Sequence, residues 1–552
     1  MNELIIEHKS FTHEDLTQID QVFLNNYPIV YMLYNPSKSG QNKRKTAYIG
    51  QTVNVNQRMK NHLESGKRKN LTDTLLIGHE KFNQSATYNI ETNLINYLIA
   101  DEEYKLQNVS QTRQKYMHGY YKKALYDQEI FSQIWQVLLD NQLVKHSLSE
   151  IENKDIFKIS PYKALSSEQL ALKEEIIDYC THNIDKNNQH IFIIEGEAGT
   201  GKSVLLSSLF NTIQDFSKDA SSPLYKTDNY LLVNHTEMQK TYHSIAEALP
   251  NLTKSRFEKP TSFINKYTGR QADIVLVDEG HLLLSTQDKF NNFSYDNQLE
   301  EIIKRAKVTI FIYDSKQFLK FKSFWDDDQL TRIVSNYDTE RKQLTRQFRM
   351  QAPIEVEEWI DNFVRKQVTP LPKNAKSKSF ELKIMASPDE LKDYIREANN
   401  IAGLARIVST FDYLHKKDGG IYYVDPEGLN LPWNTTGSPK TWAERPETIH
   451  EVGSIYTVQG FDLNYVGLVL GPSIDFDDER NELIIDTSLY KDTGAFTRTN
   501  RFNDQETIEH TKEQIILNSI NVLMKRGVHG LALYAVNPKL RQKLLSLQER
   551  NI

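Results

Sequence analysis

The stretch Gly196-Glu197-Ala198-Gly199-Thr200-Gly201-Lys202-Ser203 decides the fold of the middle of this chain. An apolar run at 191–194 precedes it and a helical pattern at 204–210 follows it, so it forms a turn from a strand into a helix. Glycines let backbone N–H groups turn toward phosphates, Lys202 can reach the β and γ phosphates of a nucleotide, and Ser203 can bind Mg²⁺. We therefore predict an ATP site whose cofactor-binding residues are Gly196, Gly199, Thr200, Gly201, Lys202 and Ser203.

Two further apolar runs end in polar residues that such a site requires. The run 274–277 leads into Asp278 and Glu279, and the run 308–313 leads into a turn that ends at Gln317. Asp278 would hold Mg²⁺ through water, and Glu279 would position the attacking water. Asp314 and Gln317, which follow the second run, could sense the γ-phosphate. The order of these elements favours ATP hydrolysis.

Short β-branched runs alternate with helical patterns from about residue 161 to the C-terminus. Continuous apolar strands between helices indicate parallel sheets that are buried on both faces. The number of these units indicates two α/β domains, at 161–335 and 336–552. The strands are expected at 191–194, 230–233, 274–277, 308–313, 405–409, 465–470 and 531–536.

The composition excludes several classes of protein. The single cysteine, Cys180, excludes an internal disulfide and any zinc site built from thiolates. The sequence has no apolar run of about 18 residues and no charged-then-apolar leader, so we expect no export and no membrane partner. A reducing, cytoplasmic location fits these features best.

The charge is unevenly distributed along the chain. The formal net charge is −6, yet residues 27–115 carry 13 Lys and Arg against seven Asp and Glu. Basic stretches lie at Lys43-Arg44-Lys45 and Lys67-Arg68-Lys69. They are either solvated loops or contacts to phosphates.

The same N-terminal region holds residues suited to phosphodiester cleavage, which needs a metal ion, an activated water and positive charge. Tyr31 lies on a predicted strand at 30–34 and Tyr48 on a second at 47–49, and a hairpin would place both phenols on one side. Gly50 permits the turn that follows. Arg58 and His62 are four residues apart on the next helix and therefore share a face.

The ordered set, continued by Glu91 and Asn108, resembles the GIY-YIG nuclease family. The resemblance implies that Arg58 binds the scissile phosphate, His62 assists proton transfer, and Tyr31 or Tyr48 helps to activate water. It also implies that Glu91, at the start of an amphipathic helix around 91–100, is the sole protein ligand of Mg²⁺ or Mn²⁺, and that Asn108 orients the site. We place this domain at 1–115, with a hairpin lengthened at 35–46, and a helical connector at 116–160.

The motifs from residue 161 to about 540 resemble a superfamily 1 helicase core, most closely the helicase-like domain of long Schlafen proteins and their bacterial relatives. The resemblance implies that Gln169 reads adenine, Arg349 and Arg526 contact the γ-phosphate, and the segment around Gly460 touches nucleic acid and ATP. Asp462 stands where the family usually has Glu, and Lys525 where it usually has Thr. These departures favour ATP hydrolysis over processive unwinding.

The fold expected from these features is an α/β multidomain chain, with a small α/β GIY-YIG domain followed by two RecA-like parallel-sheet domains. The main hypothesis is an ATP- and metal-dependent endonuclease coupled to a superfamily 1-type translocase that acts on DNA, with a role in bacterial defence against phage. One alternative is a nucleotide-operated switch whose N-terminal domain binds DNA without cutting. The other is a nuclease that acts on RNA.

Overall fold

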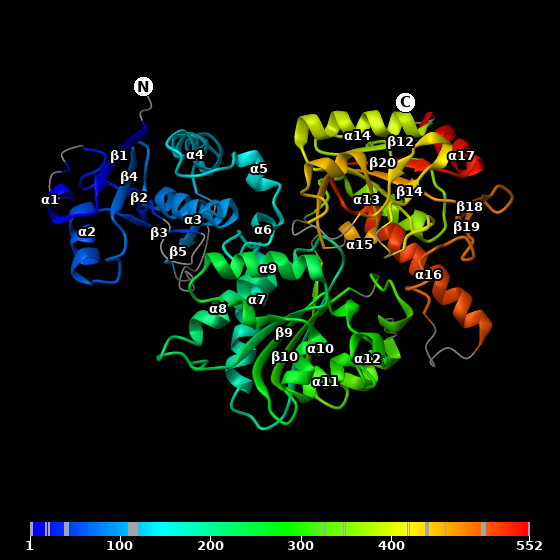
Figure 1. Ribbon diagram of the computed structural model, residues 1–552, viewed down its shortest axis with the longest axis horizontal. Helices are drawn as coiled ribbons and strands as arrows, with labels where there is room; N and C mark the ends of the chain where they lie inside the picture. Colours follow the sequence, from blue (N-terminus) through cyan, green and yellow to red (C-terminus); the bar gives the residue numbers. More distant parts are fainter. Residues whose placement is uncertain are drawn as a thin grey trace. The chain divides into compact units, whose positions relative to one another are not determined.

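Figure 1 shows the computed structural model and labels many of its helices and strands. Contacts between residues group the chain into two units: Met1–Thr181, Ser203–Asn229 and Gln239–Phe257 form the first, and the remaining segments form the second. The described residues are 4–16, 19, 22–37, 44–108, 120–314, 316–323, 325, 327–345, 347, 349–416, 418, 420–435, 441–458, 460–497 and 504–549. Residues 38–43, which are half of the predicted hairpin extension and include Lys43, therefore lie outside the described residues.

The N-terminal part is built on a five-stranded sheet with the order β1-β4-β2-β3-β5. The predicted hairpin is confirmed, because β2 and β3 pair antiparallel with Tyr31 opposite Gly50 and Leu33 opposite Tyr48. Helix α2, Val55–Glu64, follows β3 and begins at the N-cap Asn54. The strands are β1 Leu4–Ser10, β2 Ile29–Asn35, β3 Lys45–Thr52, β4 Asp73–His79 and β5 Tyr104–Leu106, and a short helix α1 spans His13–Leu16.

Helix α3, Gln84–Asp101, corrects two expectations. It begins seven residues before Glu91, so Glu91 lies in the middle of the helix and does not open it. Most of its residues are buried, so the helix is not amphipathic. Its N-cap is Asn83, whose side chain accepts a hydrogen bond from the backbone N–H of Ala86.

The helical pattern predicted for 116–160 is confirmed within the described residues. The ring of Tyr97 on α3 packs against Phe131, Trp135 and Phe157, with ring centroids 4.9, 5.5 and 4.5 Å away. These helices therefore cover α3. They are η1 Leu125–Ile130, α4 Phe131–Asp140, α5 Leu148–Glu152 and α6 Asp155–Lys158.

The middle of the chain contains a six-stranded sheet with the order β11-β6-β10-β9-β7-β8. The apolar runs predicted as strands all form strands here, and β6 pairs parallel with both β10 and β11. The strands are β6 His190–Gly196, β7 Asn229–Val233, β8 Phe257–Glu258, β9 Ala272–Asp278, β10 Ala306–Tyr313 and β11 Asp338–Leu344. The helices of this region are α7 Ser167–Asn183, α8 Lys202–Phe216, α9 Thr236–Ala248, α10 Pro260–Lys266, α11 Gln298–Lys304 and α12 Asp327–Val334.

Strand β11 corrects a boundary. The second α/β domain is expected to begin at residue 336, but β11 pairs with β6 along seven residues and completes the first sheet. The strand is mostly polar and partly exposed, because it lies at the edge of the sheet. The first α/β domain therefore extends to Leu344.

The C-terminal part contains a five-stranded sheet with the order β12-β20-β17-β13-β16, and its described pairs are parallel. Both predicted α/β sheets are thus confirmed. The strands of this sheet are β12 Glu381–Ile384, β13 Ala405–Ser409, β16 Val452–Gly453, β17 Leu463–Leu470 and β20 Gly527–Ala535. Two small sheets have two strands each: β14 Tyr423–Val424 pairs with β15 Leu431–Pro432, and β18 Ile474–Asp477 pairs with β19 Glu482–Ile485. The helices are α13 Ile354–Val364, α14 Pro388–Ala402, α15 Ile455–Val458, α16 Gln505–Met524 and α17 Pro538–Glu549. Among the helices that the structure describes, none is long and apolar enough to cross a membrane.

Candidate active sites

Four of the predicted nuclease residues meet on one face of the N-terminal sheet. The Tyr31 hydroxyl lies 2.9 Å from Nε2 of His62 and accepts a hydrogen bond of 3.0 Å from Nε of Arg58. A second Arg58 nitrogen, Nη2, donates to the Tyr48 hydroxyl at 3.5 Å. The hairpin register and the four-residue spacing on α2 produce this cluster, as the sequence predicts.

Gly50 is required by the close approach of Tyr31. A Cβ added to Gly50 would lie 2.3 Å from Oη of Tyr31 and 2.4 Å from Cζ of the same ring. The phenol therefore occupies the space that any other side chain at position 50 would fill. The sequence predicted a turn glycine here, whereas Gly50 lies within β3 and serves the packing of the cluster.

Asn108 holds the strand that carries Tyr48. Its side-chain oxygen accepts from the backbone N–H of Ile49 at 3.0 Å, and its amide donates to the carbonyl of the same residue at 2.8 Å. The side chain is buried. Asn108 therefore holds β3 next to Tyr48, and its orienting role in the active site stays a prediction.

Burial and positive charge set the protonation of the cluster. Burial and the neighbouring Tyr48 raise the pKa of Tyr31, although Arg58 opposes the shift. Burial, followed by Arg58 and Arg68, lowers the pKa of His62 to about 4. The His62 ring is therefore neutral at pH 7 and can accept a proton, while the Tyr31 phenol keeps its own.

Glu91 lies close to this cluster but is largely covered, with 7% of its surface exposed. Its charge contributes to the raised pKa of Tyr31. No cluster of three or more His, Cys, Asp or Glu side chains suited to a metal ion occurs within the described ranges. A carboxylate oxygen suits a hard divalent cation, and Mg²⁺ commonly takes one protein carboxylate and completes its shell with water and substrate phosphate. The residues present fit such an ion.

Arg68 is a residue of this region that the sequence marked only as part of a basic stretch. Its guanidinium carbon lies 4.0 Å from the centroid of the Tyr48 ring, and Nη1 donates to Oε1 of Gln107 at 2.9 Å. The run Lys67-Arg68-Lys69 signalled the charge, but only the folded loop shows which of the three contacts the tyrosine.

The phosphate-binding loop has the backbone that the motif predicts. Gly199 and Gly201 have φ angles of +88° and +75°, which favour glycine. The Lys202 ammonium donates to the carbonyls of Gly196 and Glu197 at 2.6 and 2.8 Å. It also lies 3.5 Å from the carboxylate of Asp314 at the end of β10. The sequence marks Asp314 as one of two polar residues that follow this apolar strand, but it gives no sign of the contact with Lys202.

The acidic turn after β9 follows the prediction. Asp278 is buried and accepts a hydrogen bond from the backbone N–H of Glu279 at 3.0 Å. Glu279 adopts a left-handed conformation with φ +51°, and its carboxylate lies 3.1 Å from Nε2 of the buried His281. Burial raises the pKa of Glu279, but His281 and Lys202 outweigh it and hold the pKa below its usual value. Glu279 is therefore a carboxylate that can accept a hydrogen bond from water.

Gln317 lies in the turn after β10 and donates to the Asp314 carboxylate at 2.6 Å. Gln169 lies in the first turn of α7, where its side-chain oxygen accepts from the backbone N–H of Ser166 at 3.0 Å. Ser203 is the second residue of α8. These positions are compatible with the roles that the resemblance implies, and those roles stay predictions.

The two predicted arginine fingers lie near the turn that carries Glu279. Nε of Arg349 forms an ion pair with Asp462, and Nη1 of the buried Arg526 donates to the carbonyl of Phe461 at 3.1 Å. Burial and the neighbouring Arg349 lower the pKa of Arg526 to about 9, so it stays charged at pH 7. Nη1 of Arg349 and Nε of Arg526 are buried without a hydrogen-bond partner among the described residues. Such orphaned donors fit an anionic ligand such as a nucleotide phosphate.

A segment after β7 links the acidic turn to the region around Gly460, and the sequence gave no signal for it. The Asn234 side chain donates to the carbonyl of Leu282 at 2.6 Å. The His235 ring lies 6.0 Å from the Phe461 ring. Gly460 has φ +86°, and a Cβ there would lie 2.9 Å from the Met238 methyl group. These contacts join the acidic turn, the segment 234–238 and the region around Gly460.

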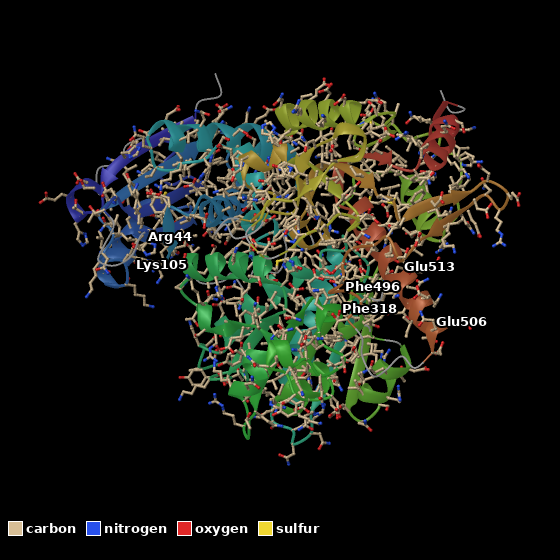
Figure 2. The ribbon with its side chains drawn as sticks, turned by 45° about the vertical axis from the view of Figure 1, so that its right-hand side comes forward. Arg44, Lys105, Phe318, Phe496, Glu506 and Glu513 are labelled. Atoms are coloured by element: carbon tan, nitrogen blue, oxygen red, sulfur yellow. The ribbon has the colours of Figure 1, made fainter. Side chains whose placement is uncertain are left out.

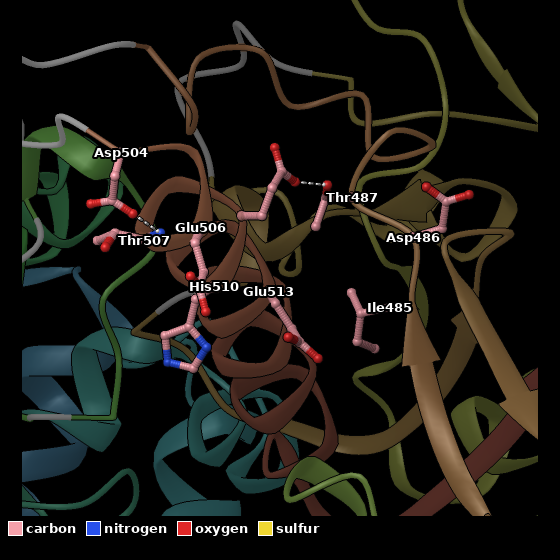
Figure 3. A pocket seen from close by; sticks show the side chains of 9 residues that line it. Ile485, Asp486, Thr487, Asp504, Glu506, Thr507, His510 and Glu513 are labelled. Atoms are coloured by element: carbon pink, nitrogen blue, oxygen red, sulfur yellow. Dashed lines mark hydrogen bonds between the residues drawn. The ribbon is translucent and has the colours of Figure 1, made fainter.

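A pocket of about 670 Å³ lies where helix α16 begins, away from the predicted residues (Figure 3). Two of its carboxylates form local hydrogen bonds: Asp504 accepts one from the backbone N–H of Thr507, and Glu509 accepts one from the Thr487 hydroxyl. Its five carboxylates repel phosphate, so this surface does not suit a nucleic acid. The lining residues are Ile485, Asp486, Thr487, Asp504, Glu506, Thr507, Glu509, His510 and Glu513.

Comparisons with known proteins identify the families of the two parts of the chain. A family model described as Schlafen group 3, DNA/RNA helicase domain, matches residues 189–537, and the model of the GIY-YIG catalytic domain matches residues 27–137. The chain is similar to the uncharacterized protein YPL245W of Saccharomyces cerevisiae, with 38% identity over 413 aligned residues that cover 69% of this chain and 90% of the yeast protein.

Two solved structures show a distant likeness. The Pif1 helicase from Candida albicans is 12% identical, with a TM-score of 0.29, and the likeness covers 69% of this chain and 97% of that chain. Dbp5 of S. cerevisiae, bound to RNA and ADP BeF3, is 11% identical, with a TM-score of 0.27, and the likeness covers 76% of this chain and 90% of that chain.

Proposed function

This chain belongs to the family described as Schlafen group 3, DNA/RNA helicase domain, and from this premise and its GIY-YIG catalytic domain we propose an ATP-dependent, metal-dependent endonuclease that acts on DNA. The two domains indicate an enzyme with phosphodiesterase and NTP hydrolase activity. The proposal adds the substrate, the coupling between the activities and the residues that carry them.

The single observation that carries the nuclease proposal is the hydrogen-bonded cluster around Tyr31. The phenol oxygen is 2.9 Å from His62 and 3.0 Å from Arg58. We assign binding of the scissile phosphate to Arg58, because its charge stabilises the developing negative charge. The neutral His62 ring accepts the proton of the attacking water, directly or through Tyr31. Tyr48 and Asn108 hold the geometry, and Glu91 would hold a divalent ion, with Mg²⁺ or Mn²⁺ as the candidates.

When bound, that ion would polarise the phosphate and help to form the nucleophile. The remaining features of the site come from the protein's own side chains and do not depend on the ion. The buried Tyr31 and the asparagine clamp on β3 fix the cluster before substrate binds, and a preorganised site does not need to reorganise during the reaction.

The ATPase proposal assigns a role to each side chain of the second site. Lys202 binds the phosphates, Asp278 and Ser203 would hold Mg²⁺, Glu279 positions the attacking water, and Gln317 senses the γ-phosphate. The cofactor-binding set further includes Gln169, Gly196, Gly199, Thr200, Gly201 and Gly460, and the arginine fingers are Arg349 and Arg526. We propose that ATP hydrolysis drives translocation along DNA. We further propose a role in bacterial defence against phage, on the ground that a nuclease and an ATPase are fused in one chain.

The test uses supercoiled plasmid and linear DNA with Mg²⁺ or Mn²⁺, with and without ATP. Wild type is compared with Glu91→Ala and Lys202→Ala. Cleavage that is lost in Glu91→Ala while ATP hydrolysis is kept supports the assignment, and the Lys202→Ala protein shows whether ATP turnover controls cutting. Wild type that hydrolyses ATP but never cuts any DNA form would falsify the DNA-nuclease proposal. The same assay on RNA then tests the RNA alternative.

A second candidate is a nucleotide-operated switch. It is favoured by the ion pair between Arg349 and Asp462, because a nucleotide phosphate that binds Arg349 would compete with this carboxylate for the same guanidinium. A strand-displacement assay run beside the ATPase assay separates the two. Turnover of ATP without strand displacement or translocation supports the switch.

A further inference from the structure

Among the residues that the structure describes, no carboxylate forms an ion pair with Arg68, which lies beside the nuclease cluster. Within the same residues, Nε of Arg68 is buried without a hydrogen-bond partner. A buried donor without a partner destabilises a fold, so it is rare unless a ligand uses it. This orphaned donor lies beside Tyr48, whose ring the guanidinium covers at 4.0 Å.

Two contacts fix where the guanidinium lies. It stacks on Tyr48 on one side and donates through Nη1 to Gln107 at 2.9 Å. Gln107 is itself anchored, because its backbone N–H donates to the carbonyl of Ala47 at 2.8 Å. Arg68 is thus held on the same strand pair that Asn108 clamps, which limits the motion of a long side chain in an otherwise exposed loop.

The register of β3 and β5 places a further cation on this face. Thr46 pairs with Lys105 in a parallel register, and side chains that alternate along a strand return to the same face every second residue. Tyr48, Lys105 and Gln107 therefore share one face of the sheet. Lys105 is exposed and lies near Arg44 at the edge strand (Figure 2).

Arg58 and Arg68 contact different parts of the same tyrosine. Arg58 reaches the Tyr48 hydroxyl at 3.5 Å, and Arg68 covers the ring. A planar guanidinium presents several donors in a fixed fork that matches phosphate oxygens. Two such groups around one side chain can hold two successive phosphates of a strand.

We propose that Arg68 is a second phosphate-binding residue of the nuclease, which binds the phosphate next to the scissile one, and that Lys105 extends this basic track across the edge of the sheet. The proposal rests on the nuclease function proposed above. It assigns Arg58 to the phosphate that is cut and Arg68 to its neighbour, so the two arginines act on different substrate groups.

The experiment measures single-turnover cleavage of a short fluorescein-labelled duplex by the full-length protein, as a function of protein and salt concentration. If wild type prefers RNA, the same duplex is made as RNA. Arg68→Gln is compared with Lys67→Gln, which removes the same charge from an exposed neighbour in the same loop. We expect Arg68→Gln to raise the half-saturating concentration about tenfold and to reduce the slope of log affinity against log salt by about 0.9, the value of one lost phosphate contact. Lys67→Gln should change the half-saturating concentration less than about twofold.

Two more variants keep the test decisive. Gln107→Leu preserves the charge but releases the guanidinium, so the half-saturating concentration should rise several-fold with the salt slope unchanged. Lys105→Gln should weaken binding less than Arg68→Gln and reduce the slope. If Arg68→Gln does not fold, as circular dichroism would reveal, Gln107→Leu and Lys105→Gln decide the question.

The outcomes separate this proposal from the nuclease proposal. Wild type that does not cleave any substrate overturns the nuclease function. Wild type that cleaves, with Arg68→Gln equal to Lys67→Gln, overturns only the phosphate role of Arg68. A lower maximal rate with unchanged half-saturation and salt slope likewise overturns it, because it shows that Arg68 acts by positioning Tyr48.

Discussion

Replacing Gly50 by alanine should slow the nuclease strongly and leave the ATPase unchanged. The new Cβ would lie 2.3 Å from the Tyr31 hydroxyl oxygen, whereas non-bonded heavy atoms prefer about 3.5–4.0 Å. The Tyr31 ring must therefore move by roughly 1 Å, although it has no exposed surface and little room. Such a shift breaks the contacts of 2.9 and 3.0 Å to His62 and Arg58.

A misplacement of about 1 Å in a catalytic group can cost about 100-fold in rate, and overpacking of a core costs about 1–3 kcal/mol. We expect Gly50→Ala to cleave about 100-fold more slowly, to melt at a lower temperature, and to hydrolyse ATP at the wild-type rate. Gln51→Ala is the matched control, because Gln51 is the next residue of β3 and lies on the opposite face. Cleavage by Gly50→Ala at the wild-type rate would show that Tyr31 is not part of the active site.

Three further predictions concern the two sites. Lys202→Ala should lower the rate of ATP hydrolysis by at least about 100-fold, since the lysine binds the transferred phosphate, and a colorimetric phosphate assay measures it. Because the pKa of His62 is lowered to about 4, the ring loses its proton at lower pH than a free histidine, so the cleavage rate should fall on acidification only near pH 4. A midpoint near pH 6.5 would contradict this. Gly460→Ala should slow ATP hydrolysis about tenfold because of its positive φ and the nearby Met238 methyl group, and Met238→Ala in the same chain should restore only part of the rate.

Much of the fold could be predicted because its elements carry strong local signals. Each apolar, β-branched run after residue 161 forms a strand, since such runs need burial on both faces. The phosphate-binding loop was predictable because the glycines are needed for its tight turn and the lysine is needed to bind phosphates. The hairpin register was predictable because side chains alternate along a strand, which places Tyr31 and Tyr48 on one face.

The errors have physical causes. Helix α3 is covered on nearly all sides, so it has no polar face from which its N-terminus could be found, and Glu91 was placed too early in it. Strand β11 reads Asp-Thr-Glu-Arg-Lys-Gln-Leu, a polar edge strand without the apolar pattern of its neighbours. The role of Arg68 depends on contacts with Tyr48 and Gln107, which are separated from it by 20 and 39 residues and which only the fold brings together.

The strand order of the middle sheet has a consequence for synthesis on the ribosome. Strand β6 emerges first, but its partners β10 and β11 follow much later, and Asp338 pairs with His190 across 148 residues of chain. At about 5–20 residues per second, β6 waits roughly 6–24 s for its first partner β10 and roughly 7–30 s for β11. The N-terminal sheet takes all its strands from residues 4–106 and can close in the meantime. The phosphate-binding loop is thus assembled on a nascent chain that needs protection from aggregation, while the nuclease domain already has its shape.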